Sequence, residues 1–234
     1  MSLLTQKALY GISRPVIGTY TSAMLKMDIQ TYAPLPKGAK IIAANHPSTT
    51  DPFFVAWVTQ KQSHILIKDT LFNVPILGQY LRSSGHIEVK AGSGQEAIDS
   101  AVEYLKQGHT VIIFPEGSIS PLSGGFHPAR SGVARIALAS GAPVIPVGIY
   151  LDRNRIRSIH TQVKGKDEVG YWYLRGPYNM TVGSPEAYKG DCNDWTRVRE
   201  VSSRVMRRIM DLAYESQDRY IERPGIFNGT LETV

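Results

Sequence analysis

The sequence predicts an α/β domain in which a layered, mostly parallel sheet is flanked by helices. Short apolar runs of the kind found in buried strands alternate along the chain with amphipathic helical patterns. The 234 residues are 42% hydrophobic and 20% charged, which is enough apolar material for one sizeable core. We expect an N-terminal amphipathic helical segment over residues 1–32, an α/β domain over 33–222 and a C-terminal tail over 223–234.

The N-terminal segment carries apolar residues at helical spacing between residues 2 and 29. Gly11 and Pro15 interrupt the spacing, so we expect a kinked helix or two short helices. Such a segment either lies in a membrane interface or packs on the core of its own domain. Its apolar residues are Leu4, Ala8, Ile12, Val16, Tyr20 and Met24.

Apolar runs bounded by turn residues predict the strands. Pro146 interrupts one of them and is expected at a bulge or on an edge strand, because proline cannot donate to a sheet ladder. The predicted strands cover residues 41–45, 64–68, 86–90 and 143–150, a strand at 110–117 that breaks into a loop, and one or two strands within 171–185.

Capping residues before a segment, or a glycine after it, predict the later helices. Ser48 to Asp51 reads S-x-x-D, and Ser93 with Glu96 forms a second capping box. The predicted helices cover residues 52–60, 94–107, 131–140 and 193–214.

The last predicted helix, 193–214, is amphipathic and strongly basic on its polar face. Such a face is usually solvated, but it can also meet anionic lipid headgroups, an acidic carrier protein or nucleic acid. No recognition motif favours nucleic acid, so we expect no nucleic-acid partner. The expected inward residues are Trp195, Val198, Val201, Val205, Ile209 and Leu212, and the arginines are Arg197, Arg199, Arg204, Arg207 and Arg208.

Net charge and cysteine content limit the possible binding partners and the cellular compartment. The net charge of +6 favours acidic partners or simply aids solubility. Cys192 is the single cysteine, which excludes an internal disulfide and fits a reducing compartment. We expect no signal peptide, because the first residues lack a long apolar region, and the apolar runs are too short to span a membrane. The expected location is cytoplasmic, peripheral on the cytoplasmic face of the membrane.

The stretch "AANHPSTTDPFF" carries the first candidate site. His46 leaves a predicted strand, and Asp51 lies in the first turn of the next helix. Strand ends followed by helix starts are where α/β sheets place ligand sites. A histidine held by a carboxylate is a proton-transfer pair, although the same residues also occur in an ordinary helix cap with a satisfied histidine.

Two other patterns resemble functional motifs. His64 and Asp69 repeat the His-x4-Asp spacing, but along a strand the odd offset would put their side chains on opposite faces. "GSGQEA" (92–97) resembles a dinucleotide fingerprint, with Glu116 near the expected spacing of its acidic residue. Against that, the preceding strand carries charges, and a capped helix start explains the loop. A nucleotide-binding (NAD-type) oxidoreductase therefore stays an alternative.

Four blocks, taken together in order, resemble the glycerolipid acyltransferase family, and in particular its lysophosphatidate acyltransferase (1-acylglycerol-3-phosphate acyltransferase) branch. The resemblance covers about residues 40–150 and extends weakly to "YNMTVGSP". Each block alone is weak, whereas the ordered set is specific. The blocks are "NHPSTTD" (45–51), "GHIEVK" (85–90), "FPEGSIS" (114–120) and "APVIPVGI" (142–149).

The resemblance implies an enzyme of phospholipid biosynthesis that moves a fatty acyl group from an acyl-CoA or acyl-carrier-protein thioester to a hydroxyl of a lyso-glycerophospholipid-type acceptor. It implies that His46 is the general base and that Asp51 orients it, which also follows from the chemistry of the pair. It further implies that Glu116, Gly117 and Ser118 contribute to the acceptor site. A non-catalytic lipid-binding protein of the same fold is the second alternative.

The acceptor site departs from the family pattern. The third block usually reads Glu-Gly-Thr-Arg, and here Ile119 stands in place of the arginine associated with an acceptor phosphate. The second block usually ends in arginine, and here it ends in Lys90. Lys68, Lys90 and Arg130 are the basic candidates for a phosphate, although each is by default a solvated surface charge.

No cofactor is implied apart from the acyl thioester co-substrate. No metal is implied either, because no cluster of histidine, cysteine and carboxylate residues has ligand spacing. The expected partners are the thioester donor, the lipid acceptor and an anionic membrane surface.

Overall fold

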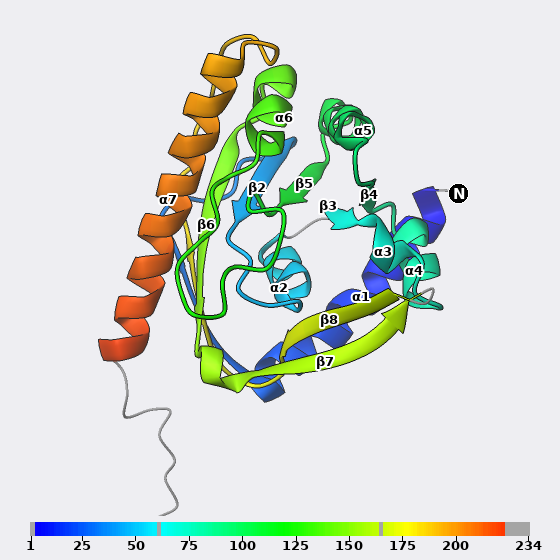
Figure 1. Ribbon diagram of the computed structural model, residues 1–234, viewed down its shortest axis with the longest axis vertical. Coiled ribbons are helices and arrows are strands. Elements are labelled where there is room, and N and C mark those ends of the chain that lie inside the picture. The colour runs from blue at the N-terminus through cyan, green and yellow to red at the C-terminus, as the bar shows by residue number, and fades with distance from the viewer. Residues whose placement is uncertain (1–2, 60–61, 164–165, 223–234) are drawn as a thin grey trace, which may run out of the picture.

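A computed structural model describes residues 3–59, 62–163 and 166–222. Its centre is a seven-stranded sheet in the order β1-β9-β6-β2-β5-β3-β4 (Figure 1). The five strands from β6 to β4 are mutually parallel, while β1 and β9 run parallel to each other and opposite to the rest. The predicted mostly parallel sheet is confirmed. Its strands are β1 (Leu25–Thr31), β2 (Lys40–Ala44), β3 (Ser63–Lys68), β4 (Ile87–Val89), β5 (Thr110–Ile113), β6 (Val144–Leu151) and β9 (Gly176–Val182).

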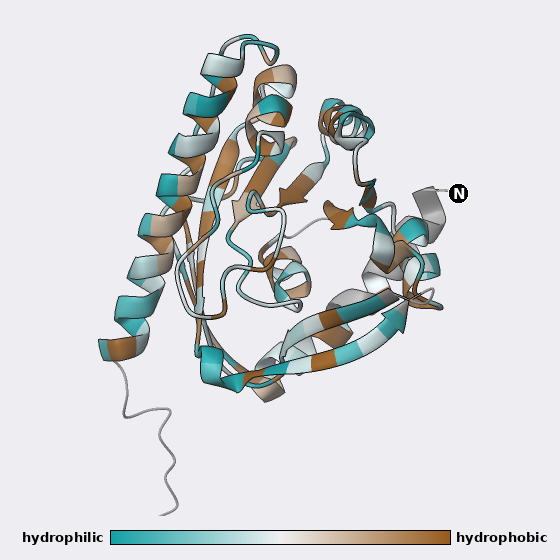
Figure 2. Ribbon diagram, viewed as in Figure 1, coloured by the Kyte–Doolittle hydropathy of each residue, from teal (hydrophilic) through white to brown (hydrophobic). Residues whose placement is uncertain are grey.

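Helices cover both faces of this sheet, because its central strands are apolar on both sides. Ile41 and Ala43 of β2 belong to one core cluster, and Ile42 and Ala44 belong to the other. Helices α5, α6 and α7 pack on the first cluster, and α2 packs on the second (Figures 1 and 2). The helices are α1 (Leu3–Met24), α2 (Asp51–Val58), α3 (Asp69–Phe72), α4 (Leu77–Ser83), α5 (Gly94–Lys106), α6 (Gly132–Ser140) and α7 (Trp195–Glu222).

Helix α7 follows the predicted apolar stripe except at its first residue. Val198, Val201, Val205, Ile209 and Leu212 are buried, as expected from their helical spacing. The prediction that Trp195 points inward is wrong, because its side chain is 64% exposed. As the first helical residue it lies past the end of the apolar face, and the Arg135 guanidinium lies 5.8 Å from its ring centroid.

The N-terminal segment is not helical throughout. Helix α1 continues past Pro15, and the chain turns at Leu25 into β1, which pairs with β9 over seven residues. The predicted helix over 25–29 is therefore wrong, because pairing with a strand about 150 residues away overrides the local periodicity. Part of the expected apolar stripe faces solvent: Ile12 is 67% exposed and Val16 is 65% exposed.

A β-hairpin that the sequence did not predict crosses the front of the molecule (Figure 1). It consists of β7 (Ile156–Val163) and β8 (Lys166–Tyr173), which follow a short 3-10 turn, Arg153–Arg155. The two strands pair only with each other, outside the main sheet. Most β7 side chains are exposed, so this strand lacks the apolar run that would have identified it.

Pro146 lies inside β6, between β2 and β9, so its expected place on an edge strand or bulge is wrong. The β9 ladder begins only at Val147, and the Pro146 carbonyl accepts a hydrogen bond from the Gly183 amide just beyond β9. The missing proline N–H therefore falls at the end of this ladder and does not interrupt it.

Candidate active site

The predicted site residues gather at the carboxyl ends of the parallel strands. His46 follows β2, Lys68 ends β3, Lys90 follows β4 and Glu116 follows β5. Parallel strands deliver their carboxyl ends to a single sheet edge, where α/β proteins bind ligands. Residues far apart in the sequence therefore meet there.

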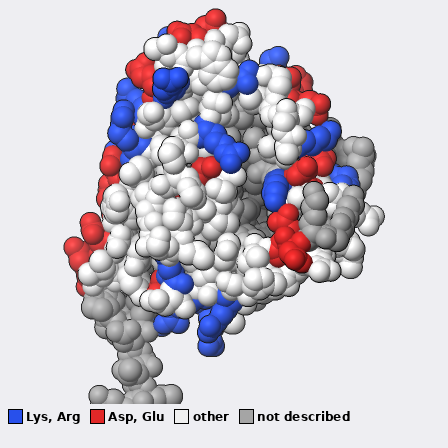
Figure 3. Space-filling view, in the orientation of Figure 1, with Lys and Arg blue, Asp and Glu red and all other residues white. Residues whose placement is uncertain are grey.

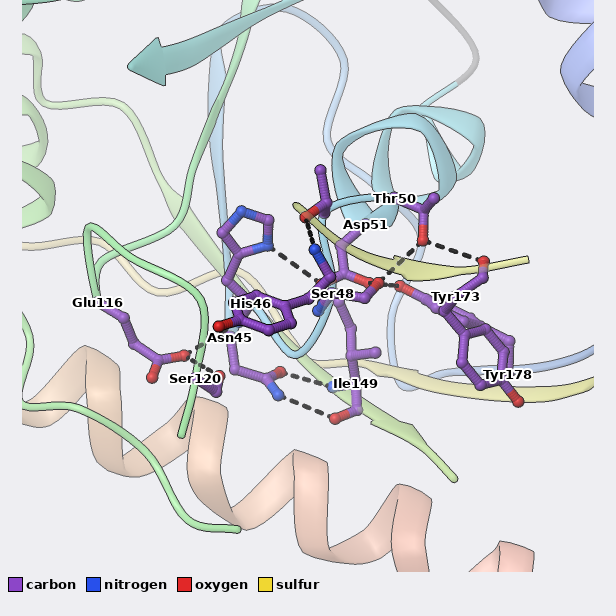
Figure 4. A network of polar contacts seen from close by, with 12 residues as sticks. Asn45, His46, Ser48, Thr50, Asp51, Glu116, Ser120, Ile149, Tyr173 and Tyr178 are labelled. Atoms are coloured by element: carbon purple, nitrogen blue, oxygen red, sulfur yellow. Dashed lines mark hydrogen bonds and ion pairs between the residues drawn. The ribbon is translucent and has the colours of Figure 1, made fainter. Parts of the chain in front are cut away.

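His46 and Asp51 form a hydrogen-bonded pair. His46 Nδ1 lies 3.1 Å from Asp51 Oδ2, and the carboxylate is fully buried, whereas the histidine side chain is 16% exposed. A carboxylate only accepts hydrogen bonds, so the contact places the ring proton on Nδ1 and leaves Nε2 with a free lone pair in the neutral ring. In Figure 4, Nε2 points away from the labelled side chains.

Asp51 is held by donors from two distant parts of the chain (Figure 4). The Ser48 backbone N–H donates to Oδ2 at 2.7 Å, and the Ser48 hydroxyl donates to Oδ1 at 2.6 Å. The Tyr178 hydroxyl, from β9, donates to Oδ1 at 2.9 Å. Burial and the neighbouring Asp51 charge raise the pKa of Tyr178 well above its usual value, so its hydroxyl keeps the proton that it donates.

The predicted capping box at Ser48 is shifted by this arrangement. Thr50 is the N-cap of α2 and makes no side-chain capping bond, and Asp51 is the first helical residue. The Asp51 carboxylate turns back to the Ser48 amide, which is one half of the predicted capping box, and also holds His46. Both oxygens of Asp51 thus serve the loop that carries the histidine.

The hairpin also holds this loop. The Thr49 N–H donates to the Tyr171 carbonyl at 2.7 Å, and the Tyr171 N–H donates to the Thr49 hydroxyl at 2.8 Å. The Thr50 hydroxyl donates to the Tyr173 carbonyl at 3.2 Å. No sequence motif assigns Tyr178 a role in the site, although the resemblance extends weakly to "YNMTVGSP", and no motif marks the hairpin.

Asn45 and Glu116 fix the backbone on either side of the histidine ring. The Asn45 amide pairs with both backbone groups of Ile149 in β6, at 2.7 and 2.9 Å. Glu116 Oε1 accepts from the His46 N–H at 3.0 Å and from the Ser120 hydroxyl at 2.6 Å, and its Oε2 accepts from the His127 N–H at 2.8 Å. Glu116 is only 2% exposed, so its carboxylate is turned towards the protein.

The His46 ring stacks on Phe114, with ring centroids 4.1 Å apart. This packing holds the ring from the side while Nε2 stays open. Among the described residues, Nε2 of His46 has no hydrogen-bond partner. The arrangement can therefore accept a proton from a hydroxyl that enters next to Nε2.

Gly117 and Arg130 are in direct contact. Gly117 has φ +67°, and a Cβ placed on it would lie 2.5 Å from Arg130 Nε, so a side chain there would collide with the guanidinium group. The Arg130 N–H donates to the Pro115 carbonyl at 2.8 Å. Arg130 therefore lies on the Glu116–Gly117–Ser118 turn, where Gly117 and Ser118 are exposed.

The two lysine candidates lie at the same sheet edge but pair with other charges. Lys68 Nζ lies 3.0 Å from Glu168 in the hairpin, and Lys90 Nζ lies 3.3 Å from Glu96. A further cation, Arg153, donates to the carbonyls of Pro121 and Gly125. Burial lowers the pKa of Arg153, while the charges of Glu116 and Asp51 act in the opposite direction.

Backbone N–H groups at the start of the helix after His46 would be natural donors to an oxyanion. The Ser48 N–H is used by Asp51, and the Thr49 N–H is used by Tyr171. Ser118 and Ile119 follow the positive-φ turn at Gly117, and their amides donate to no other described residue. Their amides are therefore candidates for this role.

The structure shows the surroundings of the two motifs that resemble functional ones. His64 is buried, and its nitrogens contact the Gly85 carbonyl at 2.7 Å and His109 at 2.8 Å, so it shares no proton with Asp69. The "GSGQEA" stretch starts α5 beside β4, the edge strand of the sheet. No described protein atom lies within 4 Å of a Cβ placed on Gly92 or Gly94, so packing against another segment does not require either glycine.

An apolar pocket opens beside the site. Thr49 and Pro52, from the loop and first turn that carry His46 and Asp51, line one part of it. The cavity has a volume of about 120 Å³. Other lining residues are Ile17, Phe53, Ala56, Trp57, Ile65, Ile67, Leu71, Leu77, Tyr80, Leu81 and Trp172, together with Gln62, Ser63, Ser84 and His86.

The basic face of α7 is partly neutralised. Glu186 pairs with Arg204 and Arg208, and Arg197 pairs with Glu200. Figure 3 shows basic and acidic side chains interspersed along α7 on the visible face. Within the described ranges, no group of three or more potential ligand side chains is placed to hold a metal ion, and no helix has the length and apolarity to cross a membrane.

Comparisons with known proteins agree with the fold and with the sequence blocks. A family model described as Acyltransferase matches residues 26–150. The 1-acyl-sn-glycerol-3-phosphate acyltransferase of Escherichia coli (strain K12) is 25% identical over 152 residues, covering 63% of this chain and 60% of that protein. The enzyme of the same name from Saccharomyces cerevisiae is 30% identical over 131 residues, covering 53% of this chain and 43% of that protein.

The fold matches a crystal structure of the 1-acyl-sn-glycerophosphate (LPA) acyltransferase PlsC from Thermotoga maritima. The TM-score is 0.61 at 20% identity, over 92% of this chain and 79% of that one. The aligned part spans 60% or less of the length of the two curated relatives named above. Because the family model covers more than half of the residues, this chain belongs to the acyltransferase family.

Proposed function

We propose that this protein transfers a fatty acyl group from an acyl thioester to a hydroxyl of a lyso-glycerophospholipid, with lysophosphatidate as the leading acceptor. The observation that carries the proposal is the His46–Asp51 pair, whose buried carboxylate fixes Nδ1 while Nε2 faces outward. Membership of the acyltransferase family and the names of the relatives support the reaction class and the acceptor class.

The reaction needs a base but no covalent enzyme intermediate, because a thioester is already an activated acyl donor. His46 Nε2 takes the proton of the acceptor hydroxyl as its oxygen attacks the thioester carbonyl carbon. Asp51 holds the ring and stabilises the imidazolium that forms. The tetrahedral intermediate then collapses, the C–S bond breaks, and the leaving thiolate takes the proton from the imidazolium. The products are an ester and a free thiol.

The apolar pocket is the proposed site of the acyl chain. It begins at Thr49 and Pro52, within six residues of His46, and is lined mainly by aliphatic and aromatic side chains. An alkyl chain gains about 0.8 kcal/mol for each methylene that leaves water, so such a pocket favours a fatty acyl donor over a short one. The donor is either a coenzyme A or an acyl-carrier-protein thioester.

Arg130 is the proposed cation for the acceptor phosphate. It lies against Gly117, next to the position where Ile119 replaces the usual arginine of this family. Lys68 and Lys90 remain candidates at the rim, but each is paired with a glutamate. Glu116 is a proposed positioning residue, because both of its carboxylate oxygens accept hydrogen bonds from the protein.

The test is acceptor-dependent release of thiol. Purified protein is given a long-chain acyl-CoA with and without lysophosphatidate, free thiol is followed colorimetrically, and the lipid product is identified by mass spectrometry. We expect thiol release only with acceptor and a loss of about 10²- to 10⁴-fold in the rate for His46→Ala. Tight binding of both ligands without turnover would instead support the non-catalytic lipid-binding alternative. Full activity of His46→Ala would overturn the assignment of the base.

A further inference from the structure

The apolar pocket follows one face of β3. Ser63, Ile65 and Ile67 line it, while His64 lies on the opposite face, where its ring stacks on Tyr104 at 3.6 Å. Side chains of a strand alternate between faces and rise about 3.3 Å per residue, so these three residues line the pocket over roughly 13 Å.

The ends of the pocket differ in their distance from the catalytic pair. Register across β5 places Ile65 level with Ile42 of β2, so Ile67 lies near the level of Ala44, close to His46. Ser63 lies level with Lys40, at the amino-terminal ends of the strands and away from His46. An acyl chain that enters beside His46 therefore runs along β3 towards Ser63.

The far end of the pocket is polar, although the rest is apolar. Gln62, Ser63 and Ser84 line it there, and His86 lines it two residues nearer to His46, level with Ile65. The Gln62 amide donates to the Ser84 carbonyl at 3.2 Å, and β4 pairing sets His86 beside Ile65. We refer to Ser84 and His86 as the polar stop.

His86, which lines this pocket, carries its ring proton on Nε2. The Ile65 backbone N–H donates to His86 Nδ1 at 3.3 Å, so the neutral ring carries its proton on Nε2. Burial, with a smaller contribution from His64, lowers the pKa of His86 to about 4, and the ring is neutral at physiological pH. Among the described residues, neither His86 Nε2 nor the buried Ser84 hydroxyl has a hydrogen-bond partner.

These two groups penalise an alkyl chain that reaches them. A methyl or methylene group pressed against an unpaired N–H or O–H excludes water and supplies no acceptor, and leaving a buried polar group unpaired is unfavourable. We propose that the polar stop limits the length of the acyl chain, which ends before His86 and Ser84. This proposal rests on the proposed acyl transfer, and it names the residues that set chain-length preference.

The experiment compares two replacements of similar size and different polarity. Wild type, His86→Met and His86→Gln are assayed for kcat/KM with saturated acyl-CoA donors that increase by two carbons, at one acceptor concentration. We expect the longest efficient donor to lengthen by at least two carbons in His86→Met, with a gain of about fourfold for each added methylene. His86→Gln should keep the wild-type order of donors.

A third variant and a modified donor guard against a folding defect. Ser84→Ala removes only the unpartnered hydroxyl, so it should shift preference in the same direction by a smaller factor while unfolding at nearly the wild-type temperature. Wild type should also prefer a long donor with a terminal hydroxyl over the plain donor of that length, and His86→Met should reverse this order. Equal shifts in the Met and Gln variants would mean that side-chain volume, and not polarity, sets the preference. No shift in any variant would mean that these residues do not limit chain length. Either result overturns the proposal.

Binding measurements separate this proposal from the proposed reaction. The dissociation constants of the same acyl-CoA series are measured without acceptor. For each variant, they should rank the donors in the same order as that variant's kcat/KM values. If that order holds and no acceptor is acylated, acyl transfer fails and the polar stop stands. If acyl transfer proceeds and its chain-length preference does not depend on residue 86, the proposed reaction stands and the polar stop fails.

Discussion

Asp51 connects the early motif to the last strand of the sheet. Its Oδ2 accepts from His46 and from the Ser48 amide, and its Oδ1 accepts from the hydroxyls of Ser48 and Tyr178. A buried carboxylate with this many donors is fixed in position, and so is the ring that it holds. The orientation of His46 therefore depends on Tyr178, which lies 127 residues beyond Asp51.

Replacing Tyr178 by phenylalanine removes one donor from Asp51. We expect kcat to fall by about tenfold and the acid limb of the pH–rate profile to move to higher pH, because the carboxylate then holds the protonated imidazole more strongly. Tyr173→Phe is the matched control, since the Tyr173 hydroxyl is also buried but donates to the Pro177 carbonyl. Both variants should lose about 1 kcal/mol of unfolding free energy, and only Tyr178→Phe should change the profile. Matching profiles would contradict the positioning role.

Arg130→Met tests the proposed phosphate contact. Loss of charge-assisted hydrogen bonds should raise KM for lysophosphatidate by about tenfold or more and leave KM for an unphosphorylated lyso-lipid unchanged. Arg199→Met, an exposed arginine of α7, should change neither value. The assignment fails if both acceptors lose affinity equally in the Arg130 variant.

At the scale of elements, α7 closes on the sheet through Gly148 of β6. A Cβ placed on Gly148 would lie 2.0 Å from the Ala213 backbone nitrogen and 2.1 Å from the Leu212 carbonyl carbon. Backbone atoms of a packed helix cannot move aside as a flexible side chain can. The contact between helix and strand is thus set by the absence of a side chain.

Gly148→Ala should therefore push α7 from β6 and lower the unfolding free energy by about 3 kcal/mol. Gly94→Ala is the control, because open space surrounds its Cβ position at the start of α5. It should be neutral or stabilise by up to about 1 kcal/mol. Denaturant unfolding measures both, and equal effects would refute the close-packing account.

Helix α1 presents apolar side chains to solvent. Ile12, Val16 and Met24 are exposed, and a peripheral membrane contact would bury such residues. We expect the double variant Ile12→Ser with Val16→Ser to bind anionic vesicles more weakly than wild type in a sedimentation assay. Ile221→Ser, at an exposed site near the end of α7, should leave binding unchanged. Unaltered binding of the double variant would exclude this stripe as the contact.

At the scale of the whole molecule, buried histidines make stability depend on pH. Burial lowers the pKa of His64 and of His86 to about 4, whereas an unfolded histidine titrates near 6.5. Between these values the unfolded chain binds protons that the folded chain does not. The free energy of unfolding must then fall as pH decreases from about 6.5 towards about 4.

The contribution of His64 to this dependence of unfolding free energy on pH can be measured separately. Each of the two histidines contributes up to about 1.4 kcal/mol per pH unit in this window. In urea unfolding between pH 6.5 and 5, His64→Asn should show a slope smaller by about that amount, whatever its absolute stability. A slope equal to that of wild type would mean that His64 does not titrate as its burial implies.

The sequence by itself determined the α/β class and the parallel core strands, and it predicted the pairing of His46 with Asp51. These features depend on local patterns: apolar runs flanked by caps and turns, and a short loop between two elements. Buried strands with both faces apolar are recognisable without their neighbours, because every residue in them is constrained in the same way.

Only the tertiary structure decided which groups support that pair. β1 is a strand because β9 lies beside it, β7 carries no apolar run that marks it, and Tyr178 reaches Asp51 through sheet order. The position of Arg130 on Gly117 and the polar end of the pocket likewise arise from segments that meet in space. Such contacts depend on how distant segments pack together, and the residues of a single segment do not reveal which distant segment will pack against it.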